Sequence, residues 1–294
     1  MNPIIKYPGS KRWLTSLLVP HIKSVLTIDG GAMYFEPFVG SGAMFFALEW
    51  GNSVIRDLNP HLINVFLSLA RRPDDAIPAL ERKLALYHMG DKAERSTLYY
   101  EIRSRYNDAC AGKEFIWNPL AAASLLFLLK TCYNGLMRFN AKGGFNTPHG
   151  DYKAPRYDID NLEAASSLLD SAHITVGDFE GACAQASRGD VLYLDPPYHG
   201  VYNGYSGKGF SWADQIRLHD AALAATYREA HVYVSLPDTA EMRTLWGSDE
   251  FHAYTIPVRR SISCKADTRG STNELLAFWP ESELPAFENY EAAF

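Results

Sequence analysis

The stretch Val191-Leu192-Tyr193-Leu194-Asp195-Pro196-Pro197-Tyr198 decides the fold. Its four apolar residues predict a buried strand, and the two prolines, which cannot donate to a sheet, end that strand. The strand end therefore carries a carboxylate, a free carbonyl and an aromatic ring. Asp195 and the Pro196 carbonyl suit an exocyclic amino group on a flat base, because they would accept its hydrogen bonds and stabilise developing positive charge. Tyr198 would stack on the base.

A second motif, Phe35-Glu36-Pro37-Phe38-Val39-Gly40-Ser41-Gly42, predicts a strand over 33–38, a glycine turn and a helix from about Ala43. Gly40 and Gly42 would let the backbone approach a ligand closely. Asp57 ends a predicted strand over 53–57, where its carboxylate could accept hydrogen bonds from ribose hydroxyls. Taken alone, the motif is also typical of a tight turn with a surface aspartate. A third glycine is missing, which disfavours a dinucleotide site. The Asp-Pro-Pro-Tyr strand end makes a nicotinamide oxidoreductase the least favoured class.

Strands and helices alternate towards both ends of the chain. Further strands are predicted over 192–195, 231–236, 251–258 and 274–279, and Ser211 with Asp214 predicts the start of a helix that extends to about Glu229. This alternation indicates an α/β fold with a mostly parallel, doubly wound sheet, whose ligands lie at the carboxyl ends of the strands. Residues 59–169 are mainly helical and include a Gly- and Asn-rich segment at 134–150. We therefore predict a catalytic domain over 1–58 and 170–294 and an inserted domain over 59–169.

Composition sets the compartment and the partners. The net charge is −6, yet residues 1–23, 138–156 and 256–270 are each basic, as expected of a basic face that binds phosphates. The four cysteines lack metal-ligand spacing, so we expect no metal and a reduced cytoplasm, in a bacterium or a phage-infected cell. The apolar run at 119–129 is too short to span a membrane and predicts a buried helix.

Three polar segments have two possible interpretations each. Residues 199–210, rich in Gly, Tyr and Ser, would cover the pocket or form a plain solvent loop. Residues 133–138 would read base edges or form an Asn-Gly turn followed by a solvated Arg138. Residues 6–11 combine an aromatic ring with two lysines, which also describes a frayed basic terminus.

Taken together, these motifs resemble the alpha-group, D12-class adenine-N6 DNA methyltransferases of the Dam type. The likeness covers nearly the whole chain in the family's order, and the segments at 133–148 and 258–263 are its most specific parts. The resemblance implies a Rossmann-like methyltransferase sheet, S-adenosylmethionine as the methyl donor and an inserted target-recognition domain. It also implies a monomer that acts on double-stranded DNA, most often at GATC, and a base flipped out of the duplex.

The resemblance assigns roles residue by residue. The catalytic tetrapeptide would be Asp195, Pro196, Pro197 and Tyr198. The cofactor would contact Tyr7, Lys11, Phe38, Gly40, Gly42, Asp57, Asp178, Phe179 and Asp195. The bases would be read by Lys6, Leu136, Arg138 and Pro148; the opened duplex would meet Asn134 and Tyr152; and the phosphates would meet Arg259, Arg260 and Arg269.

Three positions depart from the family pattern, and several alternatives remain. Asp151 replaces a basic residue, Leu236-Pro237 replaces an Asn-His pair, and Gly177-Asp178 replaces other polar residues. The same chemistry could act at another or a looser DNA site, or on an amino group of RNA or protein, although those enzymes more often carry Asn at the position of Asp195. A catalytically silent DNA-binding relative is a further alternative. The sequence does not reveal whether a restriction enzyme accompanies the chain.

Overall fold

The computed structural model describes residues 1–7, 9–28, 30–111, 117–198, 209–247, 251–259 and 271–280. The chain forms two compact units. The first contains Met1–Ser16 and Val39–Gly177, and the second contains Leu17–Phe38 with the described parts of Asp178–Tyr202 and Gly209–Phe294. Helix α1 (Arg12–Ile28) contributes residues to both. The division into a catalytic and a target-recognition domain stays a prediction.

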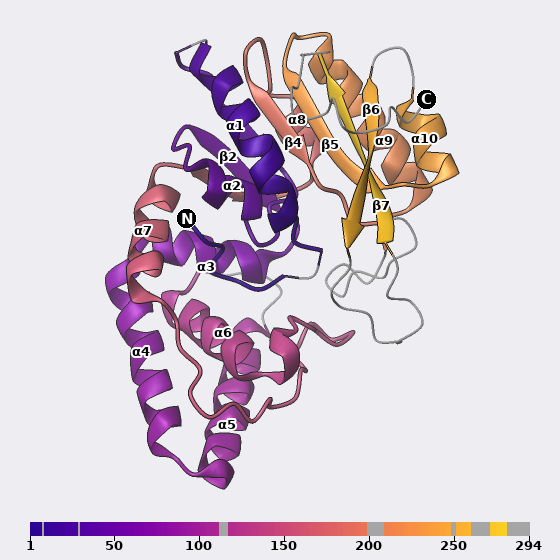
Figure 1. Cartoon of the computed structure of the whole chain (residues 1–294). Helices are drawn as coiled ribbons and strands as arrows, with labels where there is room; N and C mark the ends of the chain where they lie inside the picture. The colour runs from indigo at the N-terminus through magenta and orange to yellow at the C-terminus, as the bar shows by residue number, and fades with distance from the viewer. Residues whose placement is uncertain are drawn as a thin grey trace. The chain divides into compact units, whose positions relative to one another are not determined.

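The second unit is built on a mixed sheet, seen in Figure 1. Its strands β1 (Tyr34–Glu36), β4 (Val191–Leu194), β5 (His231–Pro237), β7 (Ser271–Trp279) and β6 (His252–Arg259) pair in the order β1-β4-β5-β7-β6. Leu192 lies opposite Phe35 on one side and Val232 on the other, in parallel register. Strand β7 runs antiparallel to both of its neighbours. The predicted strands are confirmed, and the antiparallel edge is an addition that hydrophobic pattern alone does not specify.

Besides part of α1, the described residues of the second unit form the helices α8 (Glu180–Cys183), α9 (Trp212–Thr226) and α10 (Ala240–Trp246). Helix α9 begins as predicted, because Ser211 Oγ accepts a hydrogen bond from the Asp214 N–H at 3.2 Å while the Asp214 carboxylate accepts one from the Ser211 N–H at 2.9 Å. This reciprocal pair satisfies two backbone donors that the first helical turn leaves open. The start of α9 is therefore fixed by local sequence.

The first unit contains the parallel pair β2 (Ser53–Asp57) and β3 (His173–Val176), with Asp57 opposite Val176. Strand β2 and the start of α2 (Ala43–Leu48) lie where the sequence predicts them. Strand β3 was not predicted. It has only four residues, and the exposed side chains of His173 and Val176 leave too short an apolar pattern to recognise.

The rest of the first unit is mainly helical, as predicted. It contains α3 (Pro60–Arg71), α4 (Pro73–Met89), α5 (Lys92–Cys110), α6 (Pro119–Thr131) and α7 (Ile159–Asp170). Helix α6 packs against α3, α4 and α5, and its residues 125–129 are at most 5% exposed (Figure 1). The apolar run at 119–129 is therefore a core helix. Within the described residues, no helix is both long and apolar enough to cross a membrane.

Candidate functional site

Asp195 stands directly after β4 and is held by the neighbouring strand. Ser235 Oγ of β5 donates to Asp195 Oδ1 at 3.0 Å, and the Tyr193 hydroxyl lies 3.1 Å from the same Ser235 Oγ. Tyr193 is buried, and burial followed by the nearby charge of Asp195 raises its pKa well above the usual value. Tyr193 therefore stays a neutral hydroxyl, and the chain Tyr193–Ser235–Asp195 orients one carboxylate oxygen.

Tyr198, the last residue of the tetrapeptide, is held by a different strand. Its hydroxyl donates to the carboxylate of Glu274, which is 6% exposed and belongs to β7. Glu274 lies opposite Pro237 of β5 and Ile256 of β6. This hydrogen bond fixes the position of the hydroxyl end of the Tyr198 ring at β7. No role was assigned to Glu274 from the sequence, because its partner Tyr198 lies far away along the chain.

The glycine turn of the first unit is tied to the end of β2. The N–H of Gly40 donates to Asp57 Oδ2 at 3.0 Å, and the N–H of Val39 donates to the Arg56 carbonyl at 2.9 Å. Gly40 and Gly42 have φ values of 46° and 68°, a left-handed conformation that other residues adopt at a cost. The structure thus brings together Gly40, Gly42 and Asp57, as the sequence predicts.

Asp57 is both half-buried and well supplied with donors. Besides Gly40, the N–H of Asn59 donates to Asp57 Oδ1 at 2.8 Å. Burial raises the pKa of Asp57 to about 6, against the opposing effect of these backbone hydrogen bonds. Each carboxylate oxygen has two lone pairs, so acceptor capacity remains for further hydroxyl donors. This geometry fits a ribose.

The N-terminal segment lies against the same turn. Ser10 Oγ and Ser41 Oγ are 3.0 Å apart. On either side of this contact, Tyr7 is half-buried and Lys11 is 4% exposed, so neither belongs to a frayed terminus. Tyr7 and Lys11 are therefore ordered parts of the first unit, next to the glycine turn.

The remaining candidate cofactor residues form a cluster in the second unit. The rings of Phe38 and Phe179 stack with centroids 5.5 Å apart, and Phe210 packs edge-on to Phe38 at 5.9 Å. Arg217 of α9 lies 5.1 Å over the Phe179 ring and reaches Asp178 Oδ2 at 3.2 Å. Helix α9 therefore orients both predicted residues of the Asp178-Phe179 pair.

The Gly- and Asn-rich segment of the first unit is a hairpin over 132–149. Two bridges close it, one between Cys132 and His149 and one between Phe139 and Phe145. Its side chains alternate: Leu136, Arg138 and Pro148 are exposed, whereas Met137, Phe139, Phe145 and Thr147 are buried. The three predicted base-reading residues of this segment thus share one outer face. The Arg138 side chain contacts Asn146 across the hairpin, with Nε 2.8 Å from the Asn146 Oδ1.

Lys6, Asn134 and Tyr152 meet at the base of this hairpin. Lys6 Nζ donates to the Asn134 carbonyl at 3.1 Å, and the Asn134 N–H donates to the Tyr152 hydroxyl at 3.2 Å. Asn134 has a φ of 56°, a left-handed conformation that Asn tolerates better than most residues. All three side chains are exposed, so they continue the outer face of the hairpin.

The structure describes some of the remaining predicted residues and not others. Asp151, which departs from the family pattern, forms an ion pair of 2.8 Å with Lys92, and this hydrogen bond lowers the pKa of its carboxyl. Arg259 ends β6, but Arg260 and Arg269 lie outside the described residues. Most of the predicted covering loop at 199–210 does so too.

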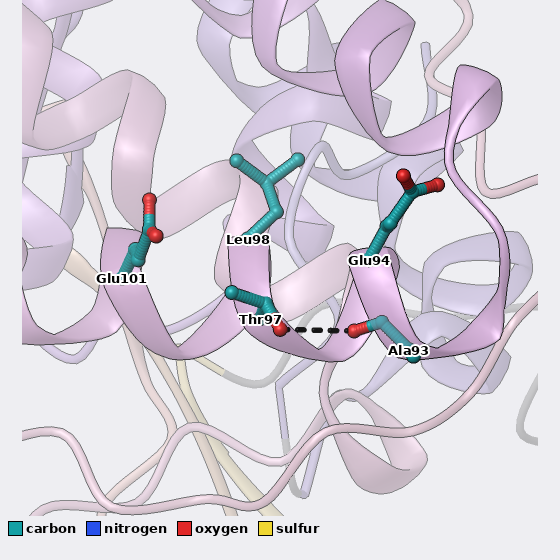
Figure 2. Close-up of a pocket in the computed structure, with 5 residues that line it drawn as sticks. All are labelled: Ala93, Glu94, Thr97, Leu98 and Glu101. Atoms are coloured by element: carbon teal, nitrogen blue, oxygen red, sulfur yellow. Dashed lines mark hydrogen bonds between the residues drawn. The ribbon is translucent and has the colours of Figure 1, made fainter.

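A surface depression on the first unit lies apart from these clusters. Figure 2 shows its lining residues, which are Ala93, Glu94, Thr97, Leu98 and Glu101, all from helix α5. Thr97 Oγ1 donates to the Ala93 carbonyl at 3.1 Å, an ordinary contact between successive turns of one helix. The depression is a groove between side chains of a single element, and it contains none of the predicted site residues.

Comparison with known proteins identifies the family. Residues 7–262 match the family described as D12 class N6 adenine-specific DNA methyltransferase. The matched segment contains Lys11, the glycine turn, the hairpin over 132–149 and the Asp-Pro-Pro-Tyr strand end.

Several curated relatives match along almost their whole length. The Type II methyltransferase M1.LlaDCHI of Lactococcus lactis is 32% identical over 285 residues, which cover 94% of either chain. The Retron Ec67 DNA adenine methylase of Escherichia coli is 32% identical over 94% of this chain and 91% of its own. A DNA adenine methylase of Vibrio cholerae is 29% identical over 94% of this chain and 95% of its own.

Proposed function

Because the chain belongs to the D12 class of N6 adenine-specific DNA methyltransferases, it is an adenine DNA methyltransferase, and we propose that it uses S-adenosylmethionine to methylate N6 of a flipped adenine, with GATC as its site. The observation that carries the proposal is the orientation of the Asp195 carboxylate by Ser235 at the end of β4. We further propose that the enzyme acts as a monomer in the cytoplasm, where its DNA substrate lies.

The chemistry requires the enzyme to activate a poor nucleophile. The lone pair of adenine N6 is delocalised into the ring, so hydrogen bonds from the amino group to the Asp195 carboxylate and the Pro196 carbonyl would favour a pyramidal nitrogen. The same acceptors would stabilise the positive charge that develops on the nitrogen during transfer. Tyr198, with its hydroxyl bonded to Glu274, would stack on the adenine and hold its plane.

The residues present fit the proposed cofactor. S-adenosylmethionine would supply an electrophilic methyl group on a sulfonium. In the first unit, Asp57 would accept hydrogen bonds from the ribose hydroxyls, the turn at Gly40 and Gly42 would allow close backbone approach, and Tyr7 and Lys11 would complete the set. In the second unit, Phe38, Asp178, Phe179 and Asp195 would contribute, the first three as an aromatic and acidic cluster held by Arg217.

An adenine inside a duplex cannot reach a strand-end carboxylate, so the reaction requires the base to be flipped out, at a cost of a few kcal/mol. The exposed Asn134 and Tyr152 at the base of the hairpin are placed together by their mutual hydrogen bond. We assign to them the contacts with the opened duplex. Arg259, Arg260 and Arg269 would bind the phosphates, which hold the protein in register without reading sequence.

Recognition of GATC is supported by the shared outer face of the hairpin. Lys6, Leu136, Arg138 and Pro148 match the family's base-reading residues, and all four are exposed in the first unit. An arginine can donate two parallel hydrogen bonds to guanine, and apolar tips such as Leu and Pro suit the thymine methyl group.

The decisive experiment is single-base mapping of N6-methyladenine in plasmid DNA from a methylation-deficient host that expresses the chain. Methylation confined to GATC would support the site and the four reading residues together. Methylation at another or looser sequence would retain the chemistry and overturn the assignment of those residues. A chain that binds S-adenosylmethionine and DNA but leaves no methyladenine would overturn the proposal that it is active.

A further inference from the structure

We propose that Asn146 is a positioning residue for sequence recognition: it fixes the Arg138 guanidinium in the one orientation that reads guanine. This inference rests on the proposed role of Arg138 in base reading. Asn146 lies within the family-like segment 133–148, but the resemblance assigns it no role, and its assignment comes from contacts across the hairpin.

Asn146 contacts Arg138 at three points. Arg138 Nε donates to Asn146 Oδ1 at 2.8 Å, and Arg138 Nη2 donates to the Asn146 carbonyl at 3.2 Å. In return, the Asn146 N–H donates to the Arg138 carbonyl at 3.0 Å. Asn146, on the opposite arm of the hairpin, therefore binds both the side chain and the backbone of Arg138.

These contacts occupy one edge of the guanidinium. A guanidinium has five N–H donors, and the pair Nε and Nη2 forms one of its two-donor edges. With that edge on Asn146, the edge formed by Nη1 and the second Nη2 hydrogen is directed away from Asn146. Two parallel donors are what guanine O6 and N7 require. Holding the exposed Arg138 in this orientation before DNA binds reduces the conformational entropy lost on binding.

Side chains of helix α5 hold the strand that carries Asn146 through hydrogen bonds to its backbone. Asn107 binds the Phe145 backbone twice, with Nδ2 donating to the carbonyl at 3.1 Å and Oδ1 accepting from the N–H at 2.8 Å. Tyr99 and Arg103 donate to the Thr147 carbonyl at 2.7 and 3.2 Å. The Asn107 side-chain amide thus makes the two backbone hydrogen bonds with Phe145 that a neighbouring strand would otherwise make.

This support sets which side chains face outwards. Phe145 and Thr147 point into the first unit, so Asn146 between them must point to the outer face, towards Arg138. A shift of one residue would bury Asn146 and release Arg138. Residues Tyr99, Arg103 and Asn107 lie four apart on one side of α5, which explains how a single helix can hold the strand at two points, Phe145 and Thr147.

The test compares Asn146→Ala, Arg138→Ala and the double variant. Each is assayed for methylation rate on duplexes that contain the mapped site and on duplexes with one base pair of that site replaced. Arg138→Ala is expected to reduce discrimination at one G·C pair by roughly 5- to 150-fold. Asn146→Ala should reduce discrimination at the same pair by roughly 2- to 10-fold. The double variant should match Arg138→Ala, because Asn146 would act only through Arg138.

Two further variants separate positioning from general effects. Asn146→Asp retains the Oδ1 acceptor and should preserve discrimination at that pair, even if added negative charge weakens DNA binding. Asn52→Ala, the same change at an exposed site in the turn before β2, is the matched control. Circular dichroism and S-adenosylmethionine binding should be unchanged in Asn146→Ala.

Other outcomes would overturn the inference in distinguishable ways. If Arg138→Ala loses discrimination and Asn146→Ala does not, the positioning role is wrong and the recognition proposal stands. If Asn146→Ala slows all duplexes equally, Asn146 contacts phosphate rather than Arg138. If Arg138→Ala itself leaves discrimination unchanged, the proposal that Arg138 reads a base pair is wrong.

Discussion

The proposed mechanism places two requirements on Asp195, because its carboxylate has to accept a hydrogen bond and has to face a fixed direction. Its position after β4 follows from the two prolines, and its direction follows from Ser235. Asp195→Ala is expected to abolish methyl transfer, since the amino group would lose its charged acceptor, while the far-ultraviolet circular dichroism of the chain stays unchanged. A single-turnover methylation assay checks this, and substantial residual turnover would refute the mechanism.

Ser235 offers a graded version of the same test. Ser235→Ala removes the donor to Asp195 Oδ1 and leaves the carboxylate in place. A hydrogen bond to a charged group contributes about 1.5–3 kcal/mol, so kcat should fall by roughly 10- to 150-fold. KM for DNA should change little. Steady-state kinetics provide the split, and a large rise in KM with normal kcat would place Ser235 in DNA binding.

Asp57 makes the proposed cofactor site sensitive to pH. Burial raises its pKa to about 6, and hydrogen bonds from ribose hydroxyls would favour the ionised carboxylate. Affinity for S-adenosylmethionine should therefore be constant above pH 7 and fall as the pH drops through about 6, where Asp57 takes up a proton. Calorimetric titration from pH 5 to 8 measures this. Asp57→Asn should bind weakly at every pH, and an unshifted profile in that variant would assign the effect to another group.

At the scale of elements, the sequence specified those whose boundaries have a local chemical cause. Prolines end β4, the Ser211 capping box starts α9, and the glycine turn leads into α2. Two features that depend on long-range pairing were not predicted. Strand β3 depends on β2, and the antiparallel placement of β7 depends on partners on both sides.

The candidate site shows the same limit. Tetrapeptide and turn residues were found because each motif is contiguous in the chain. Their supporting residues were not, because Ser235, Glu274 and Asn146 act across strands and carry no local pattern. Contacts of this kind become visible only when the fold brings distant segments together.

Helix α9 supports the proposed cofactor residues of the second unit through Arg217. Arg217 binds Asp178 at 3.2 Å, Glu180 at 2.8 Å and Asp214 at 2.9 Å. Arg217→Ala should weaken S-adenosylmethionine binding several-fold, because Asp178 and the Phe179 ring lose their common support. Stability should change little, since ion pairs this exposed contribute about 0–1 kcal/mol. Equilibrium binding and thermal unfolding separate the two effects, and equal cofactor affinity in the variant would contradict the role.

For the whole molecule, the net charge of −6 has to be reconciled with binding to a polyanion. Residues 138–156 resolve the conflict locally. They contain Arg138, Lys142, Lys153 and Arg156 against the single Asp151, which is paired with Lys92. Diffuse attraction by the whole protein would be absent, so affinity for DNA must come from contacts with individual phosphates.

This division predicts a steep but bounded salt dependence. Binding through about four phosphate contacts releases condensed counterions from the DNA. The affinity for DNA should therefore fall on the order of 100-fold when the salt concentration is raised from 50 to 200 mM. Lys142→Ala at the exposed hairpin tip should lower the slope of log K against log salt by about 1 while leaving sequence discrimination intact. Fluorescence anisotropy with a cognate and a scrambled duplex measures both quantities. A slope that Lys142→Ala leaves unchanged would move the phosphate contacts away from the hairpin, and a loss of discrimination in that variant would mean that its tip reads bases.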